Sequence, residues 1–199
     1  PLAVGKVREF KSPIAYAPNA EAFIIKDADS LREFATAAPT ATKDAIFVAD
    51  VDMTGAAWTP IEGYAGTIHG NGYAIKGLTA PLFGKAFCSI KGLHLVDVNI
   101  EETADPAVGA FARTLSAGGY QSGFIDVFPS IENCSVTGSV VLNNATTFVN
   151  TSYNEYGETV AAGLVGRAYG VTFRNCVNKA RVEVKQCYPA GHTTSLYPS

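Results

Sequence analysis

The first residues whose spacing suits chemistry are two carboxylates. Asp50 and Asp52 flank Val51, and side chains two residues apart point to the same side of a β-strand. Such a pair could bind Ca²⁺ or exchange protons with a substrate. The pair also stands just before Gly55, where aspartates commonly accept hydrogen bonds from turn amides. The sequence favours the turn role, so no catalytic residue is predicted.

The histidines and cysteines show no metal-binding spacing. His69, His94 and His192 share no ligand pattern, and His94 lies between two leucines, as an outward residue of a strand would. We expect these side chains to be solvated or hydrogen-bonded locally. The four cysteines include no C-x-x-C pair, which argues against a zinc site or a redox pair. We therefore predict neither a metal nor a cofactor.

Composition narrows the class of protein. Charged residues make up 17% and apolar residues 47% of the 199 residues, and 19 are glycine, a balance typical of short strands and tight turns. Net charge is −3 and the basic residues are scattered, which argues against nucleic acid as a partner. No apolar run reaches the length of about 18 residues that spans a bilayer. Because the chain begins with Pro1, we expect it to be a piece of a longer protein.

One helix is predicted, within "DADSLREFATAA". Ser30 and Glu33 are spaced as an S-x-x-E capping box, and Pro39 ends the pattern. The apolar residues that share one helical face are Leu31, Phe34, Ala35 and Ala38. We expect this helix, at residues 27–40, to cover the N-terminal end of the strands that follow.

After residue 40 the chain repeats itself. The runs "SIKGLHLVDVNI", "SIENCSVTGSVV" and "TFRNCVNKARVE" begin at residues 89, 130 and 172, so their spacings are 41 and 42 residues. Ile90, Ile131 and Phe173 coincide, and no helix pattern interrupts the strand signals. Repeats of this length form units that stack, which for strands gives a β-solenoid with rungs about 4.8 Å apart. We expect each unit to make two coils of about 20 residues.

The repeated Asn-Cys pair fits this geometry. Asn133 and Asn175 would adopt the left-handed turn conformation and hydrogen-bond to each other along the stack. Cys134 and Cys176 would be small buried side chains, and a disulfide between them is the alternative. Two coils would separate these cysteines by about 9.6 Å, beyond disulfide reach, so free thiols are favoured.

Several segments resemble a known family. "GLVG" at residues 163–166 is similar to the signature of GLUG-type repeats, and "PLFG" and "GAFA" are degenerate copies. "VADVDM", "WTPI" and "GNG" resemble the region that precedes such repeats in surface proteins of Bacteroides-like bacteria. The resemblance covers residues 27–184 and implies a right-handed parallel β-helix, exposure at the cell surface and adhesin-like or unknown roles. It implies no catalytic residue.

Polysaccharide lyases and hydrolases with β-helix folds are the enzymatic alternative. They need clustered acidic and basic side chains on one exposed sheet, often with Ca²⁺. Lys179, Arg181 and Lys185 alternate with small apolar residues as an outward face would, without a carboxylate cluster beside them. The sequence therefore favours a protein that is not an enzyme.

Two insertions interrupt the repeat, at residues 116–129 and 143–158. Insertions in stacked repeats map to loops, which commonly carry function. Aromatic and amide side chains gather there, as in surfaces that contact glycans or proteins, although the aromatic rings could instead pack on the flank of the coils. The predicted binding residues are Tyr120, Gln121, Phe124, Phe148, Asn150, Tyr153, Asn154 and Tyr156.

The sequence thus predicts one all-β domain, a right-handed parallel β-helix with an N-terminal capping helix. We expect an extended segment at residues 1–26, coils at residues 41–187 and a tail at residues 188–199. The expected role is adhesion, contact with a glycan or a host or neighbouring surface protein, or spacing, at the surface of a bacterial cell. Oligomeric state and ligand identity are left open.

Overall fold

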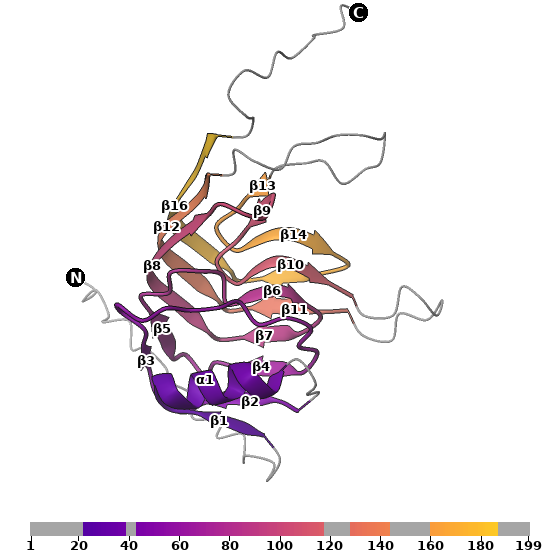
Figure 1. Ribbon diagram of the computed structural model, residues 1–199. Helices are drawn as coiled ribbons and strands as arrows, with labels where there is room; N and C mark the ends of the chain where they lie inside the picture. The colour runs from indigo at the N-terminus through magenta and orange to yellow at the C-terminus, as the bar shows by residue number, and fades with distance from the viewer. Residues whose placement is uncertain (1–21, 39–42, 118–127, 144–159, 187–199) are drawn as a thin grey trace, which may run out of the picture.

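The computed structural model describes residues 22–38, 43–117, 128–143 and 160–186. Within these residues the chain forms short parallel strands and one short helix (Figure 1). The longest sheet, sheet A, contains in spatial order β1 (Phe23–Ile25), β2 (Ala45–Phe47), β4 (Thr67–His69), β7 (Ser89–Lys91), β11 (Ser130–Glu132) and β15 (Thr172–Arg174).

Three further sheets complete the described structure. Sheet B contains β3 (Val51–Asp52), β5 (Ala74–Lys76), β8 (His94–Glu102), β12 (Ser135–Asn143) and β16 (Val177–Gln186). Sheet C contains β6 (Phe83–Ala86), β10 (Ala112–Ser116) and β14 (Val165–Tyr169), and sheet D contains β9 (Ala107–Val108) and β13 (Val160–Ala161). Every strand pair in the four sheets is parallel.

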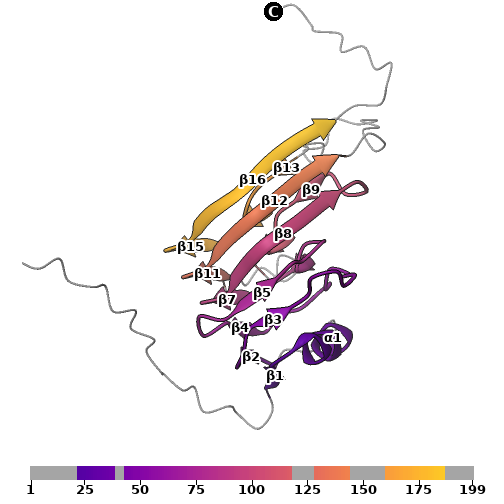
Figure 2. The ribbon, with the colours of Figure 1, turned by 90° about the vertical axis from the view of Figure 1, so that its left-hand side faces the viewer.

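The chain visits the sheets in a fixed order. It runs from sheet A through sheet B to sheet C, with sheet D between B and C where β9 and β13 form, and then returns to sheet A beside its previous strand. We call one such passage a rung; rungs begin at β2, β4, β7, β11 and β15. In the rung that begins at β2, a single bridge from Ile61 to Phe83 takes the place of the sheet C strand. Figure 2 shows the strands of sheet B stacked in sequence order from β3 to β16. This arrangement is consistent with a parallel β-helix.

The register confirms the alignment of the repeats and corrects the number of coils in each. Ile131 is paired with Ile90 on one side and with Phe173 on the other, so residues 41 and 42 apart lie on adjacent rungs. The expectation of two coils per repeat is therefore wrong. The rungs that begin at Ala45 and Thr67 take 23 and 22 residues, but the next two rungs are longer because β8 and β12 are extended and the loops between sheets lengthen.

The interior of the stack is a column of apolar side chains. Ile68, Ile90 and Ile131 are each at most 1% exposed, and they lie one above another in sheet A. Aromatic rings fill the first rungs, where the ring of Tyr64 stacks on that of Phe83 at 5.8 Å between centroids. Packing of this kind removes apolar area from water at roughly 25 cal/mol per Å², which is the main force holding the rungs together.

Two glycines of "GLVG" permit close packing where the chain passes from sheet D to sheet C. A Cβ atom at Gly163 would lie 2.1 Å from the side chain of Asn178, and one at Gly166 would lie 2.7 Å from the carbonyl oxygen of Arg113. Neither site has room for a larger residue. The pairing of Ala112 with both Phe83 and Val165 places "PLFG" and "GLVG" at equivalent positions, as the sequence predicted, but sets "GAFA" one residue out of step with them.

Helix α1 (Ala28–Ala37) lies at the end of the stack where β1 and β2 are found (Figure 1). Its buried residues are Leu31 and Phe34, and the ring of Phe34 meets that of Tyr64 edge-on at 5.1 Å. The helix begins one turn earlier than the predicted Ser30–Glu33 box requires. The capping box is instead Asp27 with Ser30, because the Asp27 carboxylate accepts from the backbone N–H of Ser30 at 2.8 Å.

At the other end of the described stack, interior columns meet solvent. Val182 pairs with Val140 and Val184 with Leu142, yet Val182 is 38% and Val184 44% exposed, whereas their partners are fully buried. Phe173, stacked on Ile131, is likewise exposed. The alternating valines of β16 thus point to the same side as the buried residues of β12. They are exposed because β16 is the edge strand of sheet B.

Candidate functional site

All eight predicted binding residues lie outside the described residues: Tyr120, Gln121, Phe124, Phe148, Asn150, Tyr153, Asn154 and Tyr156. The strands on either side of the two insertions that contain these residues are described. Residues 117–129 join β10 of sheet C to β11 of sheet A, whereas residues 144–159 join β12 of sheet B to β13 of sheet D. The two insertions therefore leave the stack at different corners of the rung.

Of the paired carboxylates, Asp52 is a turn acceptor, as the sequence favoured, whereas Asp50 links two rungs. Asp52 accepts a hydrogen bond from the backbone N–H of Thr54 at 2.8 Å. Hydrogen bonds with the side chain and the backbone of Thr54 lower the pKa of the Asp52 carboxyl. Asp50 accepts from the backbone N–H of Ala74 in the next rung at 2.8 Å. Within the described residues, no three His, Cys, Asp or Glu side chains gather closely enough to hold a metal ion.

The two described histidines are hydrogen-bonded locally. His94 shares a 2.9 Å hydrogen bond through Nδ1 with the hydroxyl of Ser135, its partner on the adjacent rung. His69 contacts Asp44 through Nε2 at 3.0 Å, and the same carboxylate accepts from the backbone N–H of Thr67. Both imidazoles thus link neighbouring rungs, as the sequence predicted for local hydrogen bonding.

Cys88, Cys134 and Cys176, the described cysteines, are free. Burial raises the pKa of Cys88 to about 12 and that of Cys134 to about 11, which keeps both thiols protonated at neutral pH. The prediction of free thiols is confirmed, but its reasoning was wrong. Cys134 and Cys176 lie on adjacent rungs, at a spacing of about 4.8 Å that falls within disulfide reach.

The outer face of sheet B carries the predicted basic residues, and several of its charges are paired. Lys185 contacts Glu101, two rungs away, at 3.2 Å. Asn143, on the rung between them, donates to the same carboxylate oxygen at 2.8 Å, and these contacts lower the pKa of Glu101. Arg181 pairs with Glu183 along β16 at 2.6 Å. Carboxylates do accompany the basic residues, so the sequence reading of this face was incomplete.

A buried ion pair holds the turn between sheets B and D. Glu102 is 5% exposed, and its Oε2 accepts from Arg113 Nε at 2.6 Å. Its other oxygen accepts from the backbone N–H groups of Ala104 and Asp105. Because both carboxylate oxygens are used within the protein, Glu102 fixes this turn and is not available to a substrate.

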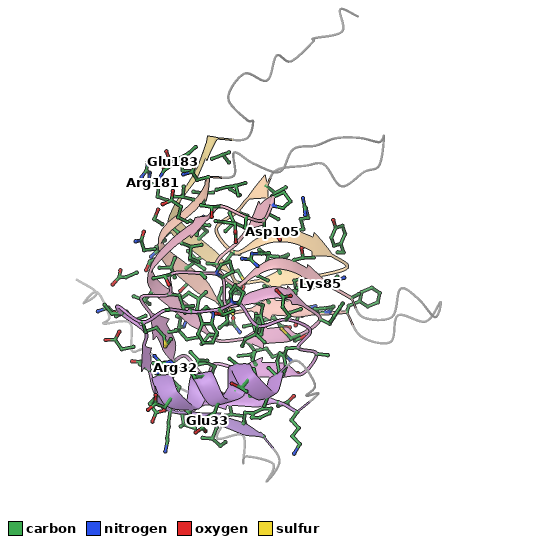
Figure 3. The ribbon with its side chains drawn as sticks, viewed as in Figure 1. Arg32, Glu33, Lys85, Asp105, Arg181 and Glu183 are labelled. Carbon is green, nitrogen blue, oxygen red and sulfur yellow. The ribbon has the colours of Figure 1, made fainter. Side chains whose placement is uncertain are left out.

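A different surface brings together aromatic and basic side chains, of which Lys85, Phe128 and Tyr169 are exposed and the others are half-buried. We call it the C–A corner surface, because it lies where the chain leaves sheet C and enters sheet A. It consists of Lys85, Phe87, Phe128, Arg167 and Tyr169. Figure 3 shows Lys85 beside β6, on the opposite side of the view from the Arg181–Glu183 pair of sheet B.

The register places these residues in outward columns. Thr114 pairs with Lys85 below and Arg167 above, and Ser116 pairs with Tyr169. Phe87 directly follows Ala86, the partner of Leu115, and so occupies the Ser116 position one rung earlier. Buried Ala86 and Leu115 alternate with these positions, so the columns Lys85–Thr114–Arg167 and Phe87–Ser116–Tyr169 face outward.

The sequence did not single out these residues. Phe87, Phe128 and Tyr169 are far apart in the chain. Tyr169 ends β14, whereas Phe87 and Phe128 lie just outside strands, so the alternation of the sequence does not show their direction. Their common position becomes visible in the pairing of the strands, in which Thr114 pairs with both Lys85 and Arg167. Alignment of "PLFGKAF", "GAFARTLS" and "GLVGRAY" would have revealed it, because Phe87 and Tyr169 then share one position.

No protein-family model matches the chain, and no curated protein matches it. Among solved structures, it is similar to a Bacteroides ovatus protein named "putative immunoglobulin A1 protease", with a TM-score of 0.54 and 18% sequence identity. The match covers 82% of this chain, and the chain spans 58% of the length of that structure. At this identity the likeness shows the fold alone.

Proposed function

We propose that the chain is a non-enzymatic contact module of a bacterial cell-surface protein, built as a right-handed parallel β-helix related to GLUG-repeat proteins. One observation carries the proposal: the strands keep their register from rung to rung, whereas the loops at the corners vary in length. Sheets A and B stay in register from β7 to β15 and from β8 to β16, apart from local bulges in sheet B.

The corners that lead from sheet C to sheet A and from sheet B to sheet D differ greatly in length. Two residues, 87–88, join β6 to β7, whereas residues 117–129 make the same connection one rung later. Likewise residues 103–106 and residues 144–159 close the same corner in successive rungs. A scaffold that keeps its register while its loops lengthen suits display of those loops to a partner, which is the role we assign to the predicted binding residues.

The Bacteroides ovatus likeness supports this proposal at the level of fold and bacterial group. The protease activity in that protein's name belongs to a longer chain, of which this one matches 58%. The proposed partner is a glycan or a host or neighbouring surface protein, and the proposed location is the bacterial cell surface. No helix among the described residues is long and apolar enough to cross a membrane.

Binding on a glycan array and to purified host surface glycoproteins tests the contact role. The chain should bind at least one of these, and a variant in which residues 144–159 are shortened should lose part of that binding. Uniform absence of binding would contradict the contact role and leave only spacing. Accessibility of the protein to protease added to intact source cells tests the location.

Incubation with polysaccharides and with immunoglobulin A1 tests the enzymatic alternative. The proposal expects no new reducing or unsaturated sugar ends and no cleavage of the immunoglobulin. Product formation that scales with protein concentration would contradict a non-enzymatic module.

A further inference from the structure

One end of the stack exposes apolar side chains beside edge strands. β14, β15 and β16 are the last strands of sheets C, A and B there, and no further strand pairs with them among the residues that the structure describes. The large apolar side chains exposed on these strands are Tyr169 (48%), Phe173 (41%), Val177 (45%), Val182 (38%) and Val184 (44%). Helix α1 lies at the opposite end, beside β1 and β2 (Figure 1). An edge of this kind is a template for pairing with another strand.

The backbone of β16 directs alternate residues toward this free edge. The N–H of Val177 donates to Cys134 on the previous rung, whereas the N–H of Ala180 donates to the side chain of Asn178 on its own strand. Pairing with β12 continues residue by residue from Val177 to Val184, so the even-numbered residues of this stretch face the free edge. A further strand would replace the Asn178 side chain as the acceptor of the Ala180 N–H.

The outward side chains of β16 carry charges of both signs. The side chain of Arg181 is 70% and that of Glu183 30% exposed, and the two residues flank Val182 (Figure 3). In a second β16 placed antiparallel, with Val182 on a two-fold axis, Arg181 of each copy lies opposite Glu183 of the other. Ala180 then lies opposite Val184 on the inner side. Opposite charges and apolar pairs across neighbouring strands stabilise a sheet, so this arrangement matches both faces of the strand.

The neighbouring registers fit less well. Moving the axis by one residue in either direction places two arginines or two glutamates directly opposite each other, which destabilises the pair of strands. The register with Val182 on the axis does bring Lys179 opposite Lys185. Lys185 already contacts Glu101 at 3.2 Å, however, which offsets its charge. Charge therefore selects the register centred on Val182.

We propose that this end of the stack binds a second copy of the chain, end to end, through antiparallel pairing of the two β16 strands about a two-fold axis at Val182. Such pairing would remove Val182 and Val184 from water and bring the two apolar interiors together. The Arg181–Glu183 match favours a second copy over an unrelated strand, because the two-fold axis itself generates it. The inference goes beyond the proposed contact function, which uses the loops at the corners.

Sedimentation equilibrium of the 199-residue chain tests the inference, and a concentration-dependent dimer is expected. Val182→Lys should raise the dissociation constant of the dimer at least about tenfold, because it places two ammonium groups at the axis. Val48→Lys is the matched control, since Val48 is 46% exposed but directly follows β2 at the opposite end of the stack. This variant should dimerise as the wild type does.

Arg181→Glu and Glu183→Arg test the register of the two strands. Each variant alone should dimerise at least about tenfold more weakly than the wild type, because like charges then face each other across the axis. An equimolar mixture of the two variants should form a heterodimer, since every residue at position 181 then lies opposite a residue of the other sign at position 183.

Circular dichroism and thermal unfolding establish that each variant is folded, and the charge-reversed pair decides the question if Val182→Lys is not. A wild type that stays monomeric at every concentration overturns the inference. A dimer that Val182→Lys leaves unchanged overturns it too, as does a mixture that forms no heterodimer. Dimerisation only after removal of residues 187–199 would also overturn it, because those residues would then occupy the edge in place of a second copy.

Discussion

In the three rungs that begin at β7, β11 and β15, the tight corner between sheets A and B depends on one residue with left-handed backbone. Gly92, Asn133 and Asn175 have φ values of 62°, 54° and 51° at equivalent positions. Asparagine tolerates this conformation better than other side chains do, and Asn175 donates through Nδ2 to Asn133 Oδ1 at 3.1 Å. The predicted turn and the predicted hydrogen bond along the stack are both confirmed.

Replacement of Asn133 tests the contribution of the left-handed turn. Asn133→Ala should lower the free energy of unfolding by about 1–2 kcal/mol, because a Cβ-bearing residue without a local hydrogen bond is strained at positive φ. Asn133→Gly, which loses the same amide but relieves the strain, is the control and should cost clearly less. Urea denaturation measures both, and equal losses would show that the amide contact, not the backbone, matters.

Buried thiols should make the protein less stable in alkali. The ordinary cysteine pKa is 9.0, and burial raises that of Cys88 to about 12. Above pH 9 the unfolded chain loses the thiol proton while the folded chain keeps it, so stability falls as pH rises. From pH 8 to pH 10 the free energy of unfolding should fall by about 1.4 kcal/mol through Cys88 alone.

Comparison with Cys88→Ala isolates this effect. The variant should show a smaller decrease in the urea midpoint between pH 8 and pH 10, even if its stability at pH 8 is lower. Cys134, with a pKa raised to about 11, adds a similar dependence that Cys88→Ala leaves in place. An identical pH dependence in the wild type and the variant would contradict a buried neutral thiol at position 88.

Among the elements, helix α1 most clearly covers apolar surface at the start of the stack. Leu31→Ala should lower the free energy of unfolding by about 2–5 kcal/mol, because Leu31 is fully buried against the first rungs. Arg32→Ala is the matched control, since Arg32 is exposed and pairs with neighbouring Asp29 on the same helix. A loss for Leu31→Ala no larger than that for Arg32→Ala would contradict a covering role for the helix.

Helix α1 shows which features of an element the local sequence predicts. Its apolar face was predicted because Leu31 and Phe34 recur at helical spacing. Its capping box was predicted wrongly, because Asp27 and Ser30 satisfy each other's backbone groups three residues before the S-x-x-E box of Ser30 and Glu33 is complete. Both capping patterns fit the sequence, and only the backbone at Asp27 distinguishes them.

At the scale of the whole molecule, the sequence was sufficient to align the repeats. It was not sufficient to predict how many rungs the chain makes within one repeat. Ile90, Ile131 and Phe173 recur because each fills the same interior position of sheet A. The number of rungs per repeat depends on how far β8 and β12 extend, and that extension is set by pairing with each other rather than by local pattern. The sequence did not predict the C–A corner surface for the same reason, since its residues come from different rungs and are brought together only by strand pairing.

The rungs should hold together without the longest loop. Residues 103–106 close the corner between sheets B and D one rung before residues 144–159 do. Replacing residues 144–159 with a Gly-Ser linker as long as residues 103–106 should change the free energy of unfolding by only about 1 kcal/mol, since loop-closure cost varies slowly with length. Thermal unfolding should remain a single cooperative transition.

Deletion of Ser139 provides the contrasting change in the same region. Loss of one residue inside β12 turns every later side chain of the strand to the opposite face, which takes Val140 and Leu142 out of the interior. That variant should lose cooperative unfolding, although far fewer residues are removed. If the loop replacement were the more damaging of the two, residues 144–159 would belong to the folded core, and the division into constant rungs and variable corners would be wrong.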